Sequence, residues 1–204
     1  ATQLNKPEAL AELYGVSSEG ITFEDRKWIG DWFQLLGINY KCIHGSFYSL
    51  RGRRKRIYVP HISYQQPWWE DNRLIADYFS RLSYAMRQGR SGAEVLVLHP
   101  IESAFGLYDP AAYHFSRPEE APPALIEMND ELAALSVNLM RAHRGFDYGD
   151  EHLMARYGRV VEGGLAVGEM CYRAVILPSL ITLRQSTVEL LLAFIAAGGR
   201  VFST

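Results

Sequence analysis

The chain has 204 residues, enough to bury a sizeable core and to form one or two domains. Its formal net charge is −2, so no strong overall field attracts it to nucleic acid or to an anionic membrane surface. Aromatic residues make up 12 % of the chain, a composition that suits a sugar-binding or interface-forming protein. No apolar stretch reaches membrane-spanning length, and no signal peptide is recognisable.

A short apolar run closed by a glycine predicts the first strand over residues 9–15. Glu12 lies at or next to the carboxyl end of this strand, where α/β enzymes commonly place catalytic groups. Isolated carboxylates more often cap a helix or form a local salt bridge, so a structural role is the alternative. Glu12 is therefore the candidate catalytic residue of this chain.

Two consecutive βα units are predicted over residues 1–90. Thr22 followed by Asp25 indicates a capping box, and helical apolar spacing then continues to Gly37, a natural residue after a helix end. A second strand over residues 38–44 ends on His44, with Tyr48 in the loop beyond it. A long helix is expected to begin at Trp68. This order is typical of a segment of a (β/α) barrel.

A second α/β domain is predicted over residues 91–204. Its expected elements are a strand at 94–100, a helix at 124–143, a hairpin at 159–167 turning at Gly163-Gly164, a strand at 174–178, a helix at 185–197 and a terminal strand. Strands and helices alternating at this spacing predict a doubly wound parallel sheet. The chain lacks an initiator methionine and both ends look cut, so we expect both domains to be incomplete and localisation is left open.

Many short motifs of the chain occur in the same order in one group of large bacterial glycosidases. They lie at residues 11–15, 23–32, 36–39, 46–49, 51–56, 66–69, 77–83, 95–100, 147–151 and 172–178. In these motifs the chain resembles glycoside hydrolases of the family 106 α-L-rhamnosidase type and their relatives. Ala11 stands where the opening motif usually has serine, and Glu19-Gly20 stand where relatives often carry tryptophan.

The resemblance implies a fold and a reaction. Residues 1–90 would be the last strands and helices of a catalytic (β/α)8 barrel, and residues 91–204 the start of a flavodoxin-like, glutamine-amidotransferase-like domain. The parent protein would hydrolyse glycosidic bonds in rhamnose-containing or related plant or bacterial polysaccharides by paired carboxylates. Glu12 would supply one carboxylate and a strand upstream of residue 1 the other, so the chain alone should be inactive.

Three residues are expected to contact the carbohydrate substrate: Tyr14, His44 and Tyr48. His44 and Tyr48 follow the strand next to that of Glu12, and two neighbouring strand ends would converge on one pocket. His44 and Tyr48 can hydrogen-bond sugar hydroxyls, and the Tyr48 ring could stack on a sugar. A lone histidine is more often structural, which is the alternative for His44. No cofactor or metal is expected in this chain, and a calcium ion in the intact parent is left open.

Other patterns have simpler interpretations. The five cations among residues 51–56 could bind phosphates or uronates, but a solvated cluster is commoner and we expect no nucleic-acid partner. Trp68 and Trp69 are expected to be packing anchors, and a platform for a sugar ring is the alternative. Cys42 and Cys171 are expected to be buried thiols, since both fall within predicted strands and neither has a partner at metal-ligand spacing. Neither is expected to be a nucleophile, because neither sits at a glycine-flanked strand-to-helix turn.

The alternative to an enzyme is a non-catalytic α/β scaffold or oligomerisation module. Exposed strand edges and helix faces of a half-barrel predict a homo-oligomer in either case.

Overall fold

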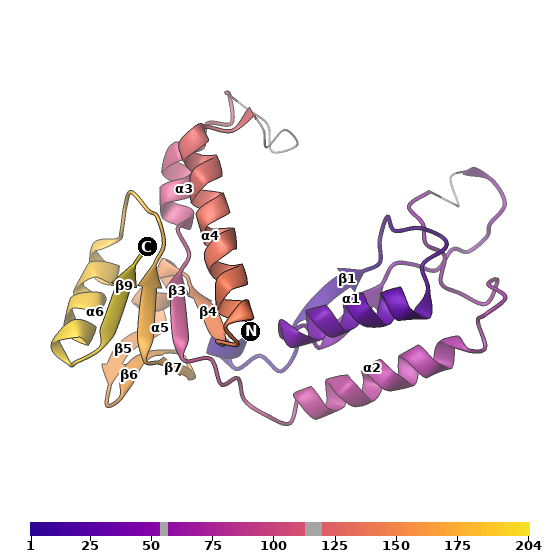
Figure 1. Ribbon diagram of the computed structural model, residues 1–204, viewed down its shortest axis with the longest axis horizontal. Helices are drawn as coiled ribbons and strands as arrows, with labels where there is room; N and C mark the ends of the chain where they lie inside the picture. The colour runs from indigo at the N-terminus through magenta and orange to yellow at the C-terminus, as the bar shows by residue number, and fades with distance from the viewer. Residues whose placement is uncertain (54–56, 113–119) are drawn as a thin grey trace. The chain divides into compact units, whose positions relative to one another are not determined.

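The computed structural model describes residues 1–53, 57–112 and 120–204, which form two compact units (Figure 1). The first unit contains Ala1 and Lys6–Arg90, and the second contains Thr2–Asn5 and Ser91–Thr204. The chain therefore contributes a short 3-10 helix, η1 (Thr2–Leu4), to the second unit before it forms the first.

The first unit has the expected β, α, β, α order. Its elements are β1 (Leu10–Leu13), α1 (Phe23–Leu35), β2 (Tyr40–Ile43) and α2 (Asn72–Met86). The two strands pair in parallel, with Leu10 opposite Tyr40 and Leu13 opposite Ile43. Their carboxyl ends therefore lie at the same edge of the sheet.

Both predicted ends of α1 are confirmed. Thr22 Oγ1 accepts a hydrogen bond from Asp25 N at 3.0 Å, and Asp25 Oδ2 accepts one from Thr22 N at 3.0 Å, which is a capping box. At the other end Gly37 has a φ of +91°, and its N–H donates to Gln34 O. Gly37 can adopt this left-handed conformation without the clash that a Cβ would cause.

The expected start of α2 is wrong by one turn, because the helix begins at Asn72 rather than at Trp68. Trp68 and Trp69 lie in successive turns in which Asp71 N donates to Trp68 O and Asn72 N to Trp69 O. Trp68 packs against the core of the first unit, which confirms it as an anchor, whereas Trp69 is partly exposed.

One face of the β1–β2 sheet is covered by α1, whereas Leu10, Glu12, Tyr40 and Cys42 on the other face are exposed. Leu13 is buried, and Ala11, Ile29 and Phe33 pack in the same cluster, so this side of β1 faces α1. Side chains alternate along a strand, so the neighbouring positions point the other way. We call these positions the open face: Leu10, Glu12, Tyr40, Cys42 and His44.

Cys42 lies on this open face and is exposed, not buried as expected. Cys171 is exposed as well, because β7 (Met170–Tyr172) buries its first and third side chains and turns the middle one outward. Alternation along a strand decides both positions, and an apolar sequence context alone does not reveal which face is covered.

The second unit contains a four-stranded parallel sheet in the order β4-β3-β8-β9. Its strands and helices are β3 (Val95–Leu98), α3 (Ile101–Leu107), α4 (Pro123–Arg141), β4 (Phe146–Gly149), α5 (Glu151–Tyr157), β8 (Ala174–Leu177), α6 (Gln185–Ala196) and β9 (Arg200–Ser203). In chain order the strands run 2-1-3-4, which is the beginning of the flavodoxin-like arrangement of doubly wound sheets.

An antiparallel sheet of β5 (Gly158–Val161), β6 (Gly164–Val167) and β7 is inserted between α5 and β8. Its first turn consists of Glu162 and Gly163, one residue earlier than expected, because Gly164 already pairs with Val161. Gly163, the second residue of this turn, has a φ of +87°, a conformation that glycine adopts without the clash that a Cβ would cause.

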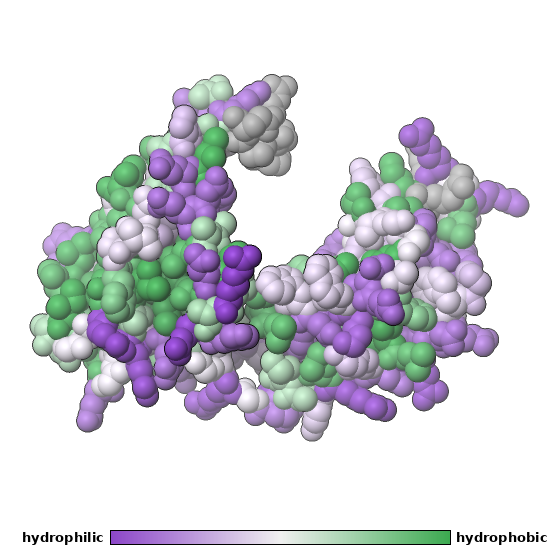
Figure 2. Space-filling view, in the orientation of Figure 1, coloured by the Kyte–Doolittle hydropathy of each residue, from purple (hydrophilic) through white to green (hydrophobic). Residues whose placement is uncertain are grey.

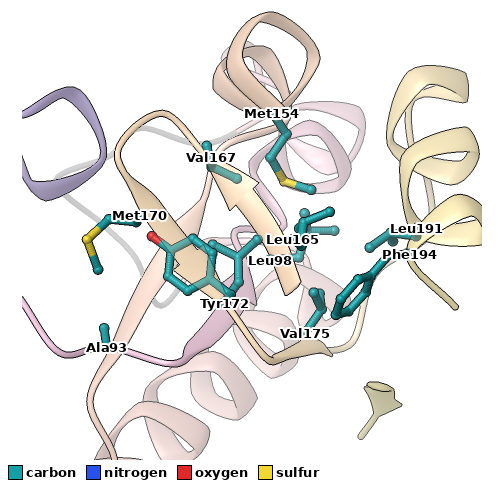
Figure 3. Close-up of a cluster of buried hydrophobic side chains, with 11 residues drawn as sticks. Ala93, Leu98, Met154, Leu165, Val167, Met170, Tyr172, Val175, Leu191 and Phe194 are labelled. Atoms are coloured by element: carbon teal, nitrogen blue, oxygen red, sulfur yellow. The ribbon is translucent and has the colours of Figure 1, made fainter. Parts of the chain in front are cut away.

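The core of the second unit lies between the parallel sheet and the layer of α5, α6 and the antiparallel sheet (Figure 3). Its buried members are Ala93, Leu96, Leu98, Met154, Leu165, Val167, Met170, Tyr172, Val175, Leu191 and Phe194. On β4, Tyr148 shares a hydrogen bond of 2.7 Å with Ser136 of α4, whereas the neighbouring Asp147 bonds Tyr172 of the core. Hydrophobic side chains are nevertheless visible over parts of this unit (Figure 2), and Leu192, Ile195 and Phe202 are exposed.

The expected α/β class is confirmed, because both units combine parallel strands with helices. Closure of a barrel around β1 and β2, and an amidotransferase-like identity of the second unit, stay predictions. Within the described ranges, no helix has the length and hydrophobicity to cross a lipid bilayer.

Candidate active site

The carboxyl ends of β1 and β2 bring Glu12 and His44 to one place. Glu12 lies opposite Cys42, and the sheet pairing continues one step further because His44 N donates to Leu13 O at 2.9 Å. Both Glu12 and His44 belong to the open face, so neither side chain is directed into the packing against the helices.

Gly15 lies between these two side chains. A Cβ placed on Gly15 would be 3.4 Å from Glu12 Oε1 and 3.5 Å from His44 Cγ. The carboxylate and the imidazole therefore both lie within van der Waals distance of the same point, where Gly15 carries no side chain.

Neither side chain is used in holding the fold together. Within the described residues, Glu12 makes no hydrogen bond or ion pair, so the local cap or salt bridge considered as its alternative role is not found. His44 is half-buried, and its Nδ1 is buried without a hydrogen-bond partner among the same residues. By contrast, Glu8 pairs with Arg87 at 2.7 Å. Glu12 and His44 are thus available to a ligand.

Tyr14 is placed differently from the expected substrate-binding role. Its ring is buried, and its hydroxyl donates to Arg26 O at 2.9 Å. Burial raises the pKa of Tyr14, an effect that the nearby Arg26 partly offsets. The geometry makes Tyr14 a support for the end of β1, and its contact with substrate stays a prediction.

Arg26 is a buried cation held among aromatic rings. Its guanidinium carbon lies 5.4 Å from the ring centroids of Phe23 and Trp68 and 5.7 Å from that of Tyr14. One guanidinium nitrogen donates to Asn72 Oδ1 at 2.7 Å, whereas Nε and Nη1 have no hydrogen-bond acceptor in the described parts of the chain. Burial lowers the pKa of Arg26. The cluster joins the starts of α1 and α2 beneath the candidate site.

Tyr48 lies in the loop after β2 and is 96 % exposed, so its side chain does not pack into the core of the first unit. The neighbouring Phe47 is held in place, since its N–H donates to His61 Nδ1 at 3.0 Å and its ring stacks on the His61 ring with centroids 5.0 Å apart. A contact of Tyr48 with a sugar stays a prediction that depends on this loop.

Sequence reasoning missed His61, which is almost fully buried beside the site. Gly45, the residue after His44, donates to Pro60 O at 3.1 Å and accepts from Ile62 N at 2.8 Å, so His61 lies directly opposite Gly45. Because His61 Nδ1 accepts a hydrogen bond, a neutral ring carries its proton on Nε2. That Nε2 is buried without a partner among the described residues. No motif in the sequence pointed to His61.

Glu19 fixes the same loop from the other side. Its Oε2 accepts hydrogen bonds from His61 N at 3.0 Å and from Gln66 Nε2 at 3.4 Å. This carboxylate is committed to the loop and is not a free partner for Glu12. Relatives of the resembled family often carry tryptophan where this chain has Glu19-Gly20. In this chain Glu19 stabilises the loop that contains His61 and Gln66.

Other expected features can be placed briefly. Of the basic cluster at residues 51–56, residues 54–56 lie outside the described residues. Among the residues that are described, no three His, Cys, Asp or Glu side chains are grouped closely enough to hold a metal ion. Cys171 lies within β7 and not at a strand-to-helix turn. The second unit thus shows no nucleophile of the amidotransferase kind within its described residues.

Comparison with known proteins gives one informative likeness. No protein-family model matches the chain, and no curated protein matches its sequence. The solved structure of a rhamnosidase from Novosphingobium sp. PP1Y matches 96 % of this chain with a TM-score of 0.64 and 19 % sequence identity. The chain has the fold of one part of a rhamnosidase. The match covers 17 % of the rhamnosidase chain, so this chain spans less than a fifth of that enzyme's length.

Proposed function

We propose that this chain is part of a glycoside hydrolase and that Glu12 and His44 belong to its carbohydrate-binding active site. The observation that carries the proposal is the meeting of the two unengaged side chains around Gly15, at the carboxyl edge of two parallel strands. Catalytic groups of barrel enzymes lie at this edge. The likeness to a rhamnosidase supports the same class of reaction.

Hydrolysis of a glycosidic bond uses two carboxyl groups, one that protonates the leaving oxygen and one that acts as base or nucleophile. Glu12 supplies one of them. In this proposal the second comes from a part of the protein outside this chain. Glu19 does not supply it, because its carboxylate is held by His61 N and Gln66. His44 hydrogen-bonds a sugar hydroxyl next to Glu12, and Tyr48 extends the binding surface from the following loop.

The proposed substrates are rhamnose-containing or related plant or bacterial polysaccharides. In this proposal β1 and β2 are neighbouring strands of a (β/α)8 barrel, and the open face is directed toward the barrel interior. The second unit is an amidotransferase-like scaffold without chemistry of its own. The chain needs no cofactor, and calcium is left to other parts of the protein.

A second candidate is a non-catalytic association module. It is favoured by exposed apolar side chains on α1, where Trp28 and Leu35 are each more than three-quarters exposed. Such side chains on a surface mark an interface. Light scattering at high concentration distinguishes a monomer from a homo-oligomer. A monomer would contradict the expected homo-oligomer.

The enzyme proposal is tested with a longer protein that contains this chain, using aryl α-L-rhamnosides and a panel of other aryl glycosides. Glu12→Gln keeps the shape of the side chain and removes its charge and acidity, so kcat should fall by a factor on the order of 1,000. Glu24→Gln, which changes an exposed glutamate on α1, is the matched control and should leave kcat unchanged. Normal turnover by Glu12→Gln would remove Glu12 from the mechanism. A wild-type protein that hydrolyses none of the glycosides would favour the association module.

A further inference from the structure

His61 connects the two loops that follow β1 and β2. In the loop after β1, Glu19 Oε2 accepts a hydrogen bond from His61 N at 3.0 Å. In the loop after β2, Phe47 N donates to His61 Nδ1 at 3.0 Å. Both loops leave the carboxyl edge of the sheet, which is the edge of Glu12 and His44. One residue therefore holds both loops that border the candidate site.

The backbone next to His44 is bonded to the segment that contains His61. Gly45 N donates to Pro60 O at 3.1 Å, and Gly45 O accepts from Ile62 N at 2.8 Å. These two bonds lie on either side of His61, so a shift of the His61 segment displaces Gly45. Because Gly45 follows His44 directly, the same shift displaces His44.

The His61 ring does two things at once. It stacks on the Phe47 ring, with centroids 5.0 Å apart and planes at 14°, and its Nδ1 accepts the Phe47 amide. The ring also has an unfavourable feature, because its buried Nε2 has no partner in the described parts of the chain. A side chain that only fills space, such as phenylalanine, would avoid the unpaired nitrogen. The acceptor at Nδ1 is therefore the property that calls for histidine here.

We infer that His61 is a positioning residue of the proposed active site: its Nδ1 fixes Phe47, and the loop after β2 thereby keeps His44 beside Glu12. The inference rests on the proposed function, since the groups that His61 positions are those proposed to bind the sugar. His61 is 1 % exposed, so its ring does not contact a substrate and acts through the loop. A displacement of about 1 Å in a binding group can lower the rate on the order of 100-fold.

Two substitutions separate the acceptor from the ring. His61→Asn places an amide oxygen close to the position of Nδ1, so it can still accept from Phe47 N, but it loses the stacked ring. His61→Phe keeps a ring against Phe47 and removes the acceptor. If His61 only filled space, His61→Phe would be the milder change, because the smaller asparagine leaves a cavity. A positioning role through Nδ1 reverses this order.

The first measurement needs no activity and uses the 204-residue chain. A Cβ on Gly15 would lie 3.6 Å from His44 Cβ, so the Gly15 α protons and the His44 β protons are close enough for a nuclear Overhauser effect. We expect this signal in the wild type and in His61→Asn, and its loss in His61→Phe. An unchanged signal in His61→Phe would overturn the inference.

Hydrogen exchange of the wild type needs no variant and therefore decides even if His61→Phe fails to fold. The Phe47 amide should be protected to the same order as the His44 amide, which donates to Leu13 O at the end of the strand pairing. Exchange of the Phe47 amide at the rate of an unprotected loop would also overturn the inference.

The second measurement uses a longer protein that contains this chain and a glycoside that it hydrolyses. We expect kcat/KM to fall roughly 10- to 100-fold in His61→Phe and less than about 3-fold in His61→Asn. The reverse order, or equal kcat/KM in the two variants, would overturn the inference. A wild type that hydrolyses no glycoside would instead contradict the proposed function, and the nuclear Overhauser comparison would then decide by itself whether His61 positions His44.

Discussion

Glu12 and His44 flank the side-chain-free position of Gly15, with Glu12 Oε1 3.4 Å and His44 Cγ 3.5 Å from the place where a Cβ would stand. The two residues are thirty-two positions apart in sequence, and the parallel pairing of β1 with β2 joins them. Neither side chain has another polar contact within the described residues, so both are available to the ligand that we propose.

The space at Gly15 gives a first prediction. Gly15→Ala places a methyl group in ordinary contact with both side chains, so the fold should be kept while the gap between them is filled. In a longer protein containing this chain, KM for a hydrolysed glycoside should rise about 10-fold, as expected for a methyl-sized obstruction of a binding site. Gly20→Ala, in the same loop with only Ser18 Oγ nearby, should leave KM unchanged. An unaltered KM in Gly15→Ala would place the substrate elsewhere.

Arg26 gives a prediction on stability. Its guanidinium lies against three aromatic rings without a carboxylate partner in the described residues, so packing rather than ion pairing should dominate. Arg26→Ala should lower the free energy of unfolding by about 3 kcal/mol, because it leaves a cavity. Arg26→Met keeps most of the contact area and removes a desolvated charge. It should therefore lower the free energy of unfolding by about half as much as Arg26→Ala, or less. Urea unfolding measures both, and equal costs for the two variants would contradict the role of packing.

The packing of η1 against Gly168 predicts a difference between two glycines. Gly163 and Gly168 both have a positive φ, but only at Gly168 would a Cβ meet another atom, Gln3 O at 1.9 Å. Gly163→Ala should therefore lower the free energy of unfolding by about 1–2 kcal/mol, because alanine is strained in the left-handed conformation. Gly168→Ala should cost about 1–3 kcal/mol more, because η1 must be displaced. Urea unfolding of the two variants gives this difference, and similar costs would show that η1 does not pack against Gly168 in solution.

The buried tyrosine hydroxyls predict a loss of stability in alkali. Burial raises the pKa of Tyr172 far above its ordinary value, although Gln3 acts in the opposite direction, and burial also raises the pKa of Tyr14. The folded state thus holds these protons more tightly than the unfolded state, whose tyrosines ionise near pH 10. The stability linked to them is complete below about pH 10 and is lost as the pH rises further.

Tyr172→Phe tests this alkaline effect. Removing the hydroxyl deletes the hydrogen bonds with Gln3 and Asp147, so the variant should be less stable at neutral pH by about 1–2 kcal/mol. Its stability should nevertheless fall less steeply than that of the wild type between pH 9.5 and pH 11.5, a range chosen to span the ordinary tyrosine pKa. Urea unfolding across this range supplies the comparison, and parallel curves would rule out Tyr172 as the cause.

Much of the fold follows from local patterns. The capping box at Thr22, the glycine after α1, and the apolar runs of β1, β3 and β8 were sufficient to place these elements within a few residues. Other short elements, α3, β4, α5 and β7, were not predicted, because polar residues or glycine interrupt their apolar residues and they are too short to show a helical or alternating period instead.

The site was only partly predictable for a related reason. Glu12 and His44 could be placed at strand ends from sequence. Other features of the site depend on contacts between segments that are distant in sequence. They are the close approach of two side chains to Gly15, the burial of Tyr14, and the backbone pairing that places His61 opposite Gly45. The exposure of Cys42 likewise depends on which face of the sheet the helices cover.

The most direct test of the central claim is a crystal structure of a longer protein that contains this chain, with a rhamnoside or an unreactive analogue bound. We expect the sugar between Glu12 and His44, and a second carboxyl group on the other side of the glycosidic oxygen. Its separation from the Glu12 carboxyl should be about 5–5.5 Å for a retaining enzyme or about 6.5–9.5 Å for an inverting one. A sugar bound away from Glu12, or a Glu12 carboxyl with no other carboxyl within about 10 Å, would contradict the assignment.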